Sequence, residues 1–263
     1  VYYPSGHDDS TPQWLQENTE VALGGVALDG TGKVWTASTS PFSSPGTLDV
    51  KGRIWRFNPE TETFDLSFRP SIWGKTWLAY TNGRVYVMSA GAEIIEIDQN
   101  TGSYVIYSTD YGDGTGGVIR VDSSGDIWRS LTVAPLGTGY GIVDKFNVAE
   151  KRFENKIEGL NRPLGLAFMA NSTIYVAENS DSAPAIARIN GGVLDKRVMQ
   201  FRPKNPYNYD DRIQRPYDVL AFGNSLVWSS DDNKEMNVLS SLCVNARYSF
   251  TSHPFYLSTD GSS

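Results

Sequence analysis

In three short segments that precede predicted β-strands, a cationic or imidazole side chain stands directly before a proline. These pairs are Arg162-Pro163, Arg215-Pro216 and His253-Pro254. A guanidinium stabilises negative charge that develops on a carbonyl or phenolate oxygen, and an imidazole moves a proton near neutral pH. The three pairs are therefore candidates for polar catalysis if the fold brings them to one face.

Further candidates lie in the segments that follow predicted strands. Glu178 ends an apolar run and is either an acid–base group or a cap on the next loop. His7 and Asp231 lie in polar segments of the same kind, and we interpret them as contacts for a substrate. Trp73 and Tyr217 precede or open predicted strands and offer an aromatic wall for an apolar ligand.

A repeated turn sequence shows which elements position these residues. Asp29-Gly30-Thr31-Gly32-Lys33-Val34-Trp35 recurs as Asp122-Ser123-Ser124-Gly125-Asp126-Ile127-Trp128, and three degenerate copies end in Tyr86, Tyr175 and Trp228. Each copy follows a short apolar run, which is typical of a β-hairpin. Asp29 and Asp122 are interpreted as turn residues rather than catalytic ones.

A second predicted strand pair follows most copies, so the repeating unit is a four-stranded antiparallel meander. These further predicted strands include Thr63 to Phe68, Gly141 to Asn147 and Ala185 to Asn190. The marker aromatic recurs about every 50 residues, the period of a propeller blade. Five units are visible, and a sixth is divided between the two ends of the chain. We therefore predict an all-β, six-bladed β-propeller that forms one domain over residues 1–263. Residues 254–258 are expected to form the inner strand of the closing blade, beside Val1 to Tyr3.

In such a ring, the segments that enter the inner strands and the loops between second and third strands open on one face. We predict the site there, around the central channel. His253, Arg215, Arg162 and Glu178 are the predicted catalytic residues; Trp73, Tyr217, His7 and Asp231 are the predicted substrate contacts.

Composition excludes several classes of function. The chain has 23 Lys and Arg against 30 Asp and Glu, a net charge of −7. That sign opposes binding to nucleic acid. No window is apolar enough for a membrane-spanning helix, and the single Cys243 has no partner for a disulfide or a zinc site.

Two features favour passage through the secretory pathway. The sequence begins with Val1 instead of Met, and Asn171-Ser172-Thr173 is an acceptor sequence for N-glycosylation. Asn171 is expected in the turn between the first two strands of a blade, on the face opposite the channel.

The segment from Arg162 to Phe168, followed by Ile174 to Asn179 and Ala187 to Ile189, resembles the senescence-marker-protein/gluconolactonase and virginiamycin B lyase group of propellers. The gluconolactonase resemblance implies one divalent metal held by acid and amide side chains. Those positions align with Gly24, Gly117, Leu164 and Tyr217, none of which supplies such a ligand. We therefore predict no metal and no cofactor.

The lyase resemblance implies a catalytic His and Glu, for which His253 and Glu178 are the candidates. Metal-free fungal members of this broad group are similar to cyclases of natural products, including hetero-Diels–Alder catalysts. Our first hypothesis is a cofactor-free enzyme that cyclises or dehydrates a small apolar organic substrate. The alternatives are a lactonase or lyase with a displaced metal site built from Asp231, Asp232 and Glu178, and a non-catalytic propeller that binds a ligand.

Overall fold

The computed structural model describes residues 22–39, 54–68, 70, 77–88, 93–109, 114–133, 140–169, 172–201, 215–222, 225–230, 235–240 and 243–249. Within these ranges twenty strands form five four-stranded antiparallel sheets, and no helix occurs. Each sheet is a meander whose strands pair in chain order. Each sheet is called a blade below and is numbered in chain order.

Blade 1 contains β1 (Ala22–Leu28), β2 (Val34–Thr39), β3 (Ile54–Asn58) and β4 (Thr63–Phe68). Blade 2 contains β5 (Trp77–Thr81), β6 (Arg84–Met88), β7 (Ile94–Asp98) and β8 (Tyr104–Tyr107). Blade 3 contains β9 (Gly114–Val121), β10 (Ile127–Val133), β11 (Tyr140–Asn147) and β12 (Arg152–Asn161). Blade 4 contains β13 (Pro163–Phe168), β14 (Ile174–Glu178), β15 (Ala185–Asn190) and β16 (Val193–Gln200). Blade 5 contains β17 (Pro216–Phe222), β18 (Ser225–Ser230), β19 (Glu235–Ser240) and β20 (Cys243–Ser249).

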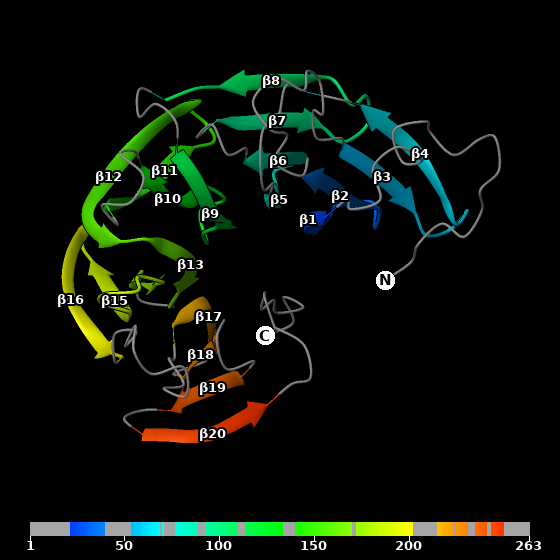
Figure 1. The fold of residues 1–263 in the computed structure, drawn as a ribbon. Helices are drawn as coiled ribbons and strands as arrows, with labels where there is room; N and C mark the ends of the chain where they lie inside the picture. Colours follow the sequence, from blue (N-terminus) through cyan, green and yellow to red (C-terminus); the bar gives the residue numbers. More distant parts are fainter. Residues whose placement is uncertain are drawn as a thin grey trace, which may run out of the picture.

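The blades follow one another around a common axis (Figure 1). Their first strands are innermost, and each contacts the first strand of the next blade, from β1 through β5, β9 and β13 to β17. This arrangement confirms the prediction of an all-β propeller built from four-stranded antiparallel blades. The predicted closing blade, with residues 254–258 and Val1 to Tyr3, lies outside the described residues.

The repeated Asp has the same structural role in blades 1 and 3. One carboxylate oxygen of Asp122 accepts hydrogen bonds from the backbone N–H groups of Ser124 and Asp126, at 2.9 and 3.0 Å. The other accepts from the indole N–H of Trp128 at 2.8 Å. Asp29 binds the indole of Trp35 at the same distance. The Asp and the Trp that recur at this spacing are therefore hydrogen-bonded to each other, and this contact, the clasp, fixes the first hairpin of the blade.

These contacts also set the acidity of the two carboxyl groups. Partial burial raises the pKa of Asp29 and of Asp122, but the hydrogen bonds from the turn and from the indole outweigh it. In both cases the pKa lies below the usual aspartate value.

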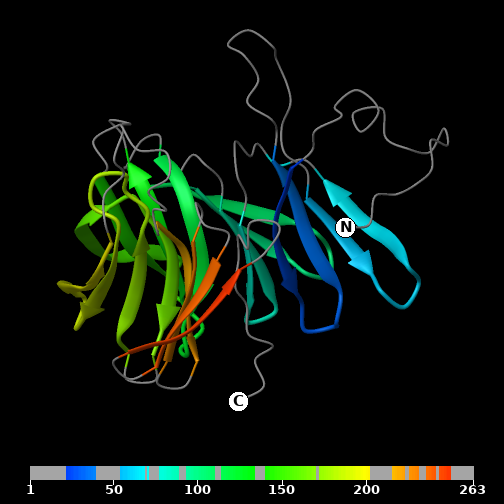
Figure 2. The same ribbon diagram turned by 60° about the horizontal axis from the view of Figure 1, so that its bottom comes forward.

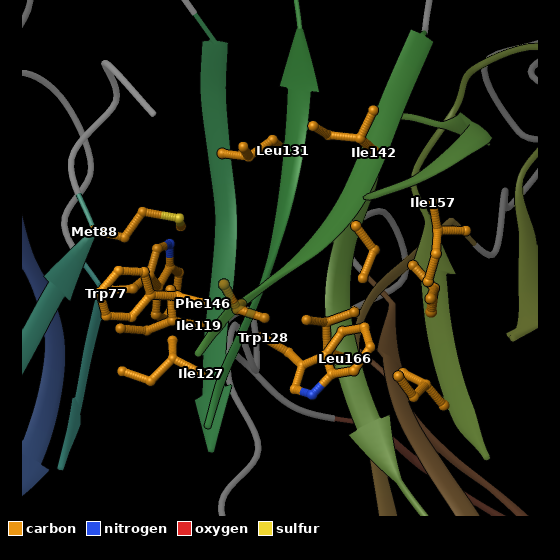
Figure 3. Packing of buried hydrophobic residues seen from close by; sticks show 14 of the residues in the cluster. Trp77, Met88, Ile119, Ile127, Trp128, Leu131, Ile142, Phe146, Ile157 and Leu166 are labelled. Atoms are coloured by element: carbon orange, nitrogen blue, oxygen red, sulfur yellow. The ribbon is translucent and has the colours of Figure 1, made fainter. Parts of the chain in front are cut away.

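The core lies between blades rather than within them, because neighbouring sheets pack face to face. Trp77 and Met88 of blade 2 pack in one cluster with Ile119 of blade 3 and Leu166 of blade 4 (Figure 3). Every residue of β10 is buried. The strands run from one face of the ring to the other, and the turns gather at the two faces (Figure 2).

Four of the five inner strands carry a β-bulge near the end at which the chain enters them. The register shifts between Leu23 and Val26 in β1, and at matching places in β9, β13 and β17. In β13 the shift falls between Pro163 and Leu166. A bulge sharpens the twist and redirects side chains, so the entering ends of these strands differ in shape from regular strand.

The sequence pattern located most outer strands but missed two of them. Predicted strands at Thr63 to Phe68, Gly141 to Asn147 and Ala185 to Asn190 match β4, β11 and β15 closely. The outer pair of blade 5, β19 and β20, was not predicted. Apolar residues do alternate in both strands, Met236 and Val238 in β19 and Val244, Ala246 and Tyr248 in β20, but the sequence from Ser240 to Cys243 contains no Gly, Asn or Pro to indicate a turn between them.

Candidate functional site

Two of the three predicted pairs with proline lie at matching places in neighbouring blades. Pro163 is the first residue of β13 and Pro216 is the first residue of β17. Proline suits the start of a strand because it has no N–H to give to the ladder. Arg162 and Arg215 therefore stand just outside the inner strands of blades 4 and 5, where the chain enters them.

Asn179 connects these two positions. Its backbone N–H donates to the carbonyl oxygen of Arg162 at 3.0 Å, and its side-chain amide donates to the carbonyl oxygen of Pro216 at 3.2 Å. Asn179 is buried and directly follows β14. The entering segments of blades 4 and 5 and the loop between β14 and β15 thus share one face, as the sequence predicts. We call the face formed by Arg162, Asn179, Asp181 and Arg215 the corner face.

Arg162 combines an unusual backbone with an available side chain. Its φ is +49°, in the left-handed region that residues other than glycine rarely adopt. The residue is exposed, and its guanidinium makes no hydrogen bond or ion pair with the described part of the chain. A residue held in such a conformation indicates that its surroundings fix its position, here in part through Asn179.

Arg215 is held differently. Its guanidinium forms an ion pair with the carboxylate of Asp181, in the loop after β14. Asp181 is exposed while most of the Arg215 side chain is buried. The pair ties the entry of blade 5 to blade 4 and leaves its acidic member at the surface.

Glu178 lies at the end of β14 and is completely buried. Its two carboxylate oxygens accept from Nε and Nη2 of Arg197 at 2.7 and 2.9 Å. One of them also accepts from the backbone N–H of Asn161 at 2.7 Å. These contacts join β14 to β16 and to the end of blade 3, and none of them is with the loop after β14 that Glu178 was expected to cap. The role of Glu178 as a base stays a prediction.

Tyr217 is the bulged residue of β17, between Pro216 and Asp218 in the ladder. It is partly buried, as expected of a residue in the wall of a site. Its counterpart in β13, Leu164, also lies within a bulge. The positions that align with the family's metal ligands thus coincide with the bulged part of the inner strands.

The remaining predicted residues fall outside the described ranges. These are the catalytic candidate His253, the substrate contacts Trp73, His7 and Asp231, and the glycosylation candidate Asn171. Asp232, part of the alternative metal site, is also outside them. Their predicted roles stay predictions.

Within the described ranges, no three His, Cys, Asp or Glu side chains gather as a metal-binding set, and no helix is long and apolar enough to span a membrane. What the corner face does offer is charge: one available guanidinium and a second one paired to an exposed carboxylate. Such groups bind and polarise a carbonyl, carboxylate or phenolate oxygen.

Sequence reasoning did not single out Asn179 as a site residue. The signal was its place directly after Glu178 in the loop opposite both Arg–Pro pairs. An amide has separate donors and an acceptor, so it suits a position where two backbone carbonyls must be joined.

No protein-family model matches the chain, and no curated protein matches it in sequence. Solved structures do. A catalytically inactive virginiamycin B lyase from Staphylococcus aureus with quinupristin is 15% identical, with a TM-score of 0.63, over 89% of this chain and 72% of that one. The periplasmic gluconolactonase of Pseudomonas aeruginosa is 13% identical, with a TM-score of 0.61, over 88% and 73%.

A chain from a nidogen/laminin complex is also similar, at 11% identity and a TM-score of 0.58, over 87% of this chain and 80% of that one. At these identities the likenesses show the propeller fold. They include lyase and lactonase enzymes as well as a protein from a protein–protein complex, so the fold alone does not decide the activity.

Proposed function

We propose that this protein is an enzyme that acts on a small organic molecule at the corner face, with Arg162 stabilising negative charge on a carbonyl or phenolate oxygen. The observation that carries the proposal is the state of Arg162 itself. Its guanidinium is exposed and without a partner in the described part of the chain, while its backbone is held at a φ of +49°. Strained residues of this kind concentrate at functional sites.

Arg215 supplies the second cation. Its partner Asp181 is exposed, so a negatively charged or strongly polarised ligand oxygen can take the place of that carboxylate. Asn179 fixes the backbone on both sides, which keeps the two guanidinium groups on one face. A ligand held by both would have its electrophilic group oriented before reaction.

The reaction class that we favour is cyclisation or dehydration of an apolar natural-product intermediate, of the hetero-Diels–Alder type. Such a reaction needs an apolar wall, here assigned to Trp73 and Tyr217, and a cation that polarises one oxygen. His253 is the proposed proton shuttle. A lactonase or lyase reaction is the alternative within the same site, because it also develops charge on a carbonyl oxygen.

A non-catalytic ligand-binding propeller is the second candidate. The observation that favours it is Glu178, whose carboxylate is buried and fully engaged by Arg197 and by the Asn161 N–H. An acid–base group must reach the proton that it moves, and Glu178 does not do so in this arrangement. In this candidate the corner face recognises a ligand oxygen without transforming the ligand.

The test is a comparison of Arg162→Gly with two controls. Glycine removes the guanidinium and adopts a positive φ without strain, so the variant should be at least as stable as the parent. It should lose turnover by roughly 10²-fold if the guanidinium acts in the transition state. Glu62→Gly controls for the glycine, since Glu62 has a φ of 54° in an exposed turn. Arg152→Ala controls for the loss of a surface charge.

The substrates to use are a panel of small lactones, cyclic depsipeptides and phenolic ketones, with products followed by mass spectrometry. Turnover in Arg162→Gly equal to that of the parent would remove Arg162 from the reaction. Binding of panel members without turnover by the parent would favour the ligand-binding candidate.

A further inference from the structure

The five inner strands can be compared position by position, because each pairs with a second strand that carries the marker aromatic. The residue opposite that aromatic is small and apolar in four blades: Ala27, Ala79, Ala167 and Val219. In blade 3 it is Arg120, opposite Trp128. An arginine therefore stands where the repeat otherwise has a short aliphatic side chain.

The neighbouring position shows a second departure. One residue nearer the entering end of the strand, the side chain is Val26, Leu78, Ile119 or Leu166 in blades 1 to 4. In blade 5 it is Asp218, paired with Ser229. A carboxylate thus replaces a branched apolar side chain at a position that is buried in every one of the other blades except blade 1.

The two exceptions bind each other. Nη2 of Arg120 donates to Oδ2 of Asp218 at 2.8 Å, although the residues belong to blades 3 and 5. Blade 4 lies between blades 3 and 5 (Figure 1), and its first strand β13 contacts both β9 and β17, so the ion pair passes β13 on the inner side of the ring. The other oxygen of Asp218 accepts from the N–H of Val219 at 2.9 Å.

A glycine in β13 lies against Asp218. A Cβ added to Gly165 would lie 2.4 Å from Oδ1 of Asp218 and 2.5 Å from its Cα. Because the Cα belongs to the backbone, the close approach of β13 and β17 requires glycine here, as the approach of β1 to β5 favours Gly25 at the matching position of blade 1.

Stability alone does not explain the pair. A buried ion pair is often no more stabilising than apolar residues of similar size, and the other blades show which apolar residues the fold accepts here. The contrast with Arg129 and Asp144 is informative. Those residues pair within blade 3, both side chains are fully buried, and the Arg129 guanidinium lies over the Phe153 ring. The Arg120 side chain is 25% exposed, whereas the Asp218 side chain is fully buried.

We propose that Arg120, oriented by Asp218, anchors the negatively charged oxygen of a small organic ligand at the axis of the ring. The ligand class is an organic carboxylate or phenolate, since a guanidinium binds such oxygens through a planar fork of N–H groups. The buried carboxylate fixes the guanidinium in place before the ligand arrives, which lowers the cost of binding. The proposal rests on the proposed function only in taking the ligand to be a small organic molecule.

The first experiment restores the pattern of the other blades. Arg120→Ala alone should lower the melting temperature, because it removes the guanidinium that pairs with the buried Asp218 carboxylate. The double variant Arg120→Ala/Asp218→Leu should melt at or above the parent temperature. A double variant that melts as low as Arg120→Ala would overturn the proposal, since the ion pair would then be a structural clasp.

The second experiment measures binding of benzoate by calorimetry, with benzyl alcohol as the uncharged control. The parent should bind benzoate and not the alcohol. Arg120→Lys, which keeps the charge but loses the fork, should bind benzoate at least 10-fold more weakly while folding normally. No binding of benzoate by the parent, or equal affinity in Arg120→Lys, would contradict the proposal.

Arg162→Gly separates this proposal from the proposed function. It should bind benzoate as the parent does, because Arg162 lies on the corner face and Arg120 near the axis. If Arg162→Gly loses benzoate and the Arg120 variants keep it, the anchor is Arg162 and the axis site is refuted. If the Arg120 variants lose benzoate while Arg162→Gly keeps full turnover, the axis site stands and the role proposed for Arg162 fails.

Discussion

Blade 3 lies in the middle of the five described blades. It differs from blades 1 and 5, which lie at the two ends of the series. Ile119 in blade 3 is 1% exposed, whereas Val26, at the same position in blade 1, is 63% exposed. A blade buries both faces only when it has a neighbour on each side. Residues that are exposed here but buried in an interior blade therefore mark faces that need a further neighbour.

The first hairpins differ in the same way. Trp128 donates its indole N–H to Asp122, which lies two residues after the strand partner of the tryptophan. The corresponding residue in blade 5 is Ala221, two residues after Val219. The indole N–H of Trp228 is buried and has no hydrogen-bond partner among the described residues. Trp228 also packs with Ala167 and Ala177 of the preceding blade, whereas Trp128 contacts Phe168 of the following one.

The largest expected effect concerns the face of blade 1 that carries Val26 and that no described blade covers. Val26→Asp should destabilise the protein by about 3 kcal/mol, because a charge would be forced into an apolar contact with the closing blade. Val193, equally exposed at 63% on the outermost strand of blade 4, provides the control. Val193→Asp should leave the melting temperature unchanged. Equal melting temperatures for the two variants would show that no blade covers Val26.

The clasp of blade 3 gives the next effect. Asp122→Ala removes the acceptor of the Trp128 indole and two backbone hydrogen bonds in the turn. We expect a loss of about 2 kcal/mol, or a fall in melting temperature of roughly 5 °C. Calorimetry on Asp122→Ala and Asp126→Ala, side by side, measures the clasp against a change elsewhere in the same turn. A melting temperature within one degree of the parent would refute the clasp.

The same carboxylates determine how the free energy of unfolding falls at acidic pH. The pKa of Asp29 and of Asp122 lies below the usual 3.8 in the folded protein. Their contribution is therefore fully present above pH 3.8 and is lost as the pH falls from there through the folded-state pKa. Chemical unfolding between pH 5 and about pH 2.5 should show a shallower decline for the double variant Asp29→Asn/Asp122→Asn than for the parent. Parallel curves would contradict the assignment.

The smallest expected effect is a gain in stability from a substitution in blade 5. Ala221→Asp places a carboxylate where Asp29 and Asp122 stand in their hairpins, within reach of the Trp228 indole. We expect stabilisation of up to about 1 kcal/mol, limited by the burial of the new charge. The same substitution at Ala27, opposite Trp35 rather than two residues beyond it, provides the control and should destabilise. A fall in melting temperature for Ala221→Asp would show that Trp228 is not arranged like Trp128.

The sequence by itself determined the repeating unit, its four-stranded form and the place of Asp29 and Asp122 in turns, because these depend on residues close together in the chain. Alternation, turn residues and spacing are properties of short stretches of chain, and the hydrogen bonds of a hairpin form within such stretches. The place of Arg162 and Arg215 at the entry of inner strands followed for the same reason. The outer strands of blade 5 were missed because no Gly, Asn or Pro stands between them in the sequence to indicate a turn.

Only the tertiary structure decided which groups meet across blades. Asn179 joins Arg162 to Pro216, Arg197 takes up the carboxylate of Glu178, and Arg120 reaches Asp218 past Gly165. No pattern along the chain encodes these contacts, because they depend on how far one blade is rotated from the next and on how closely the inner strands approach the axis. The bulges set that approach, together with glycines such as Gly117 and Gly165, at which a Cβ would clash with the next inner strand. Their effect depends on the assembled ring.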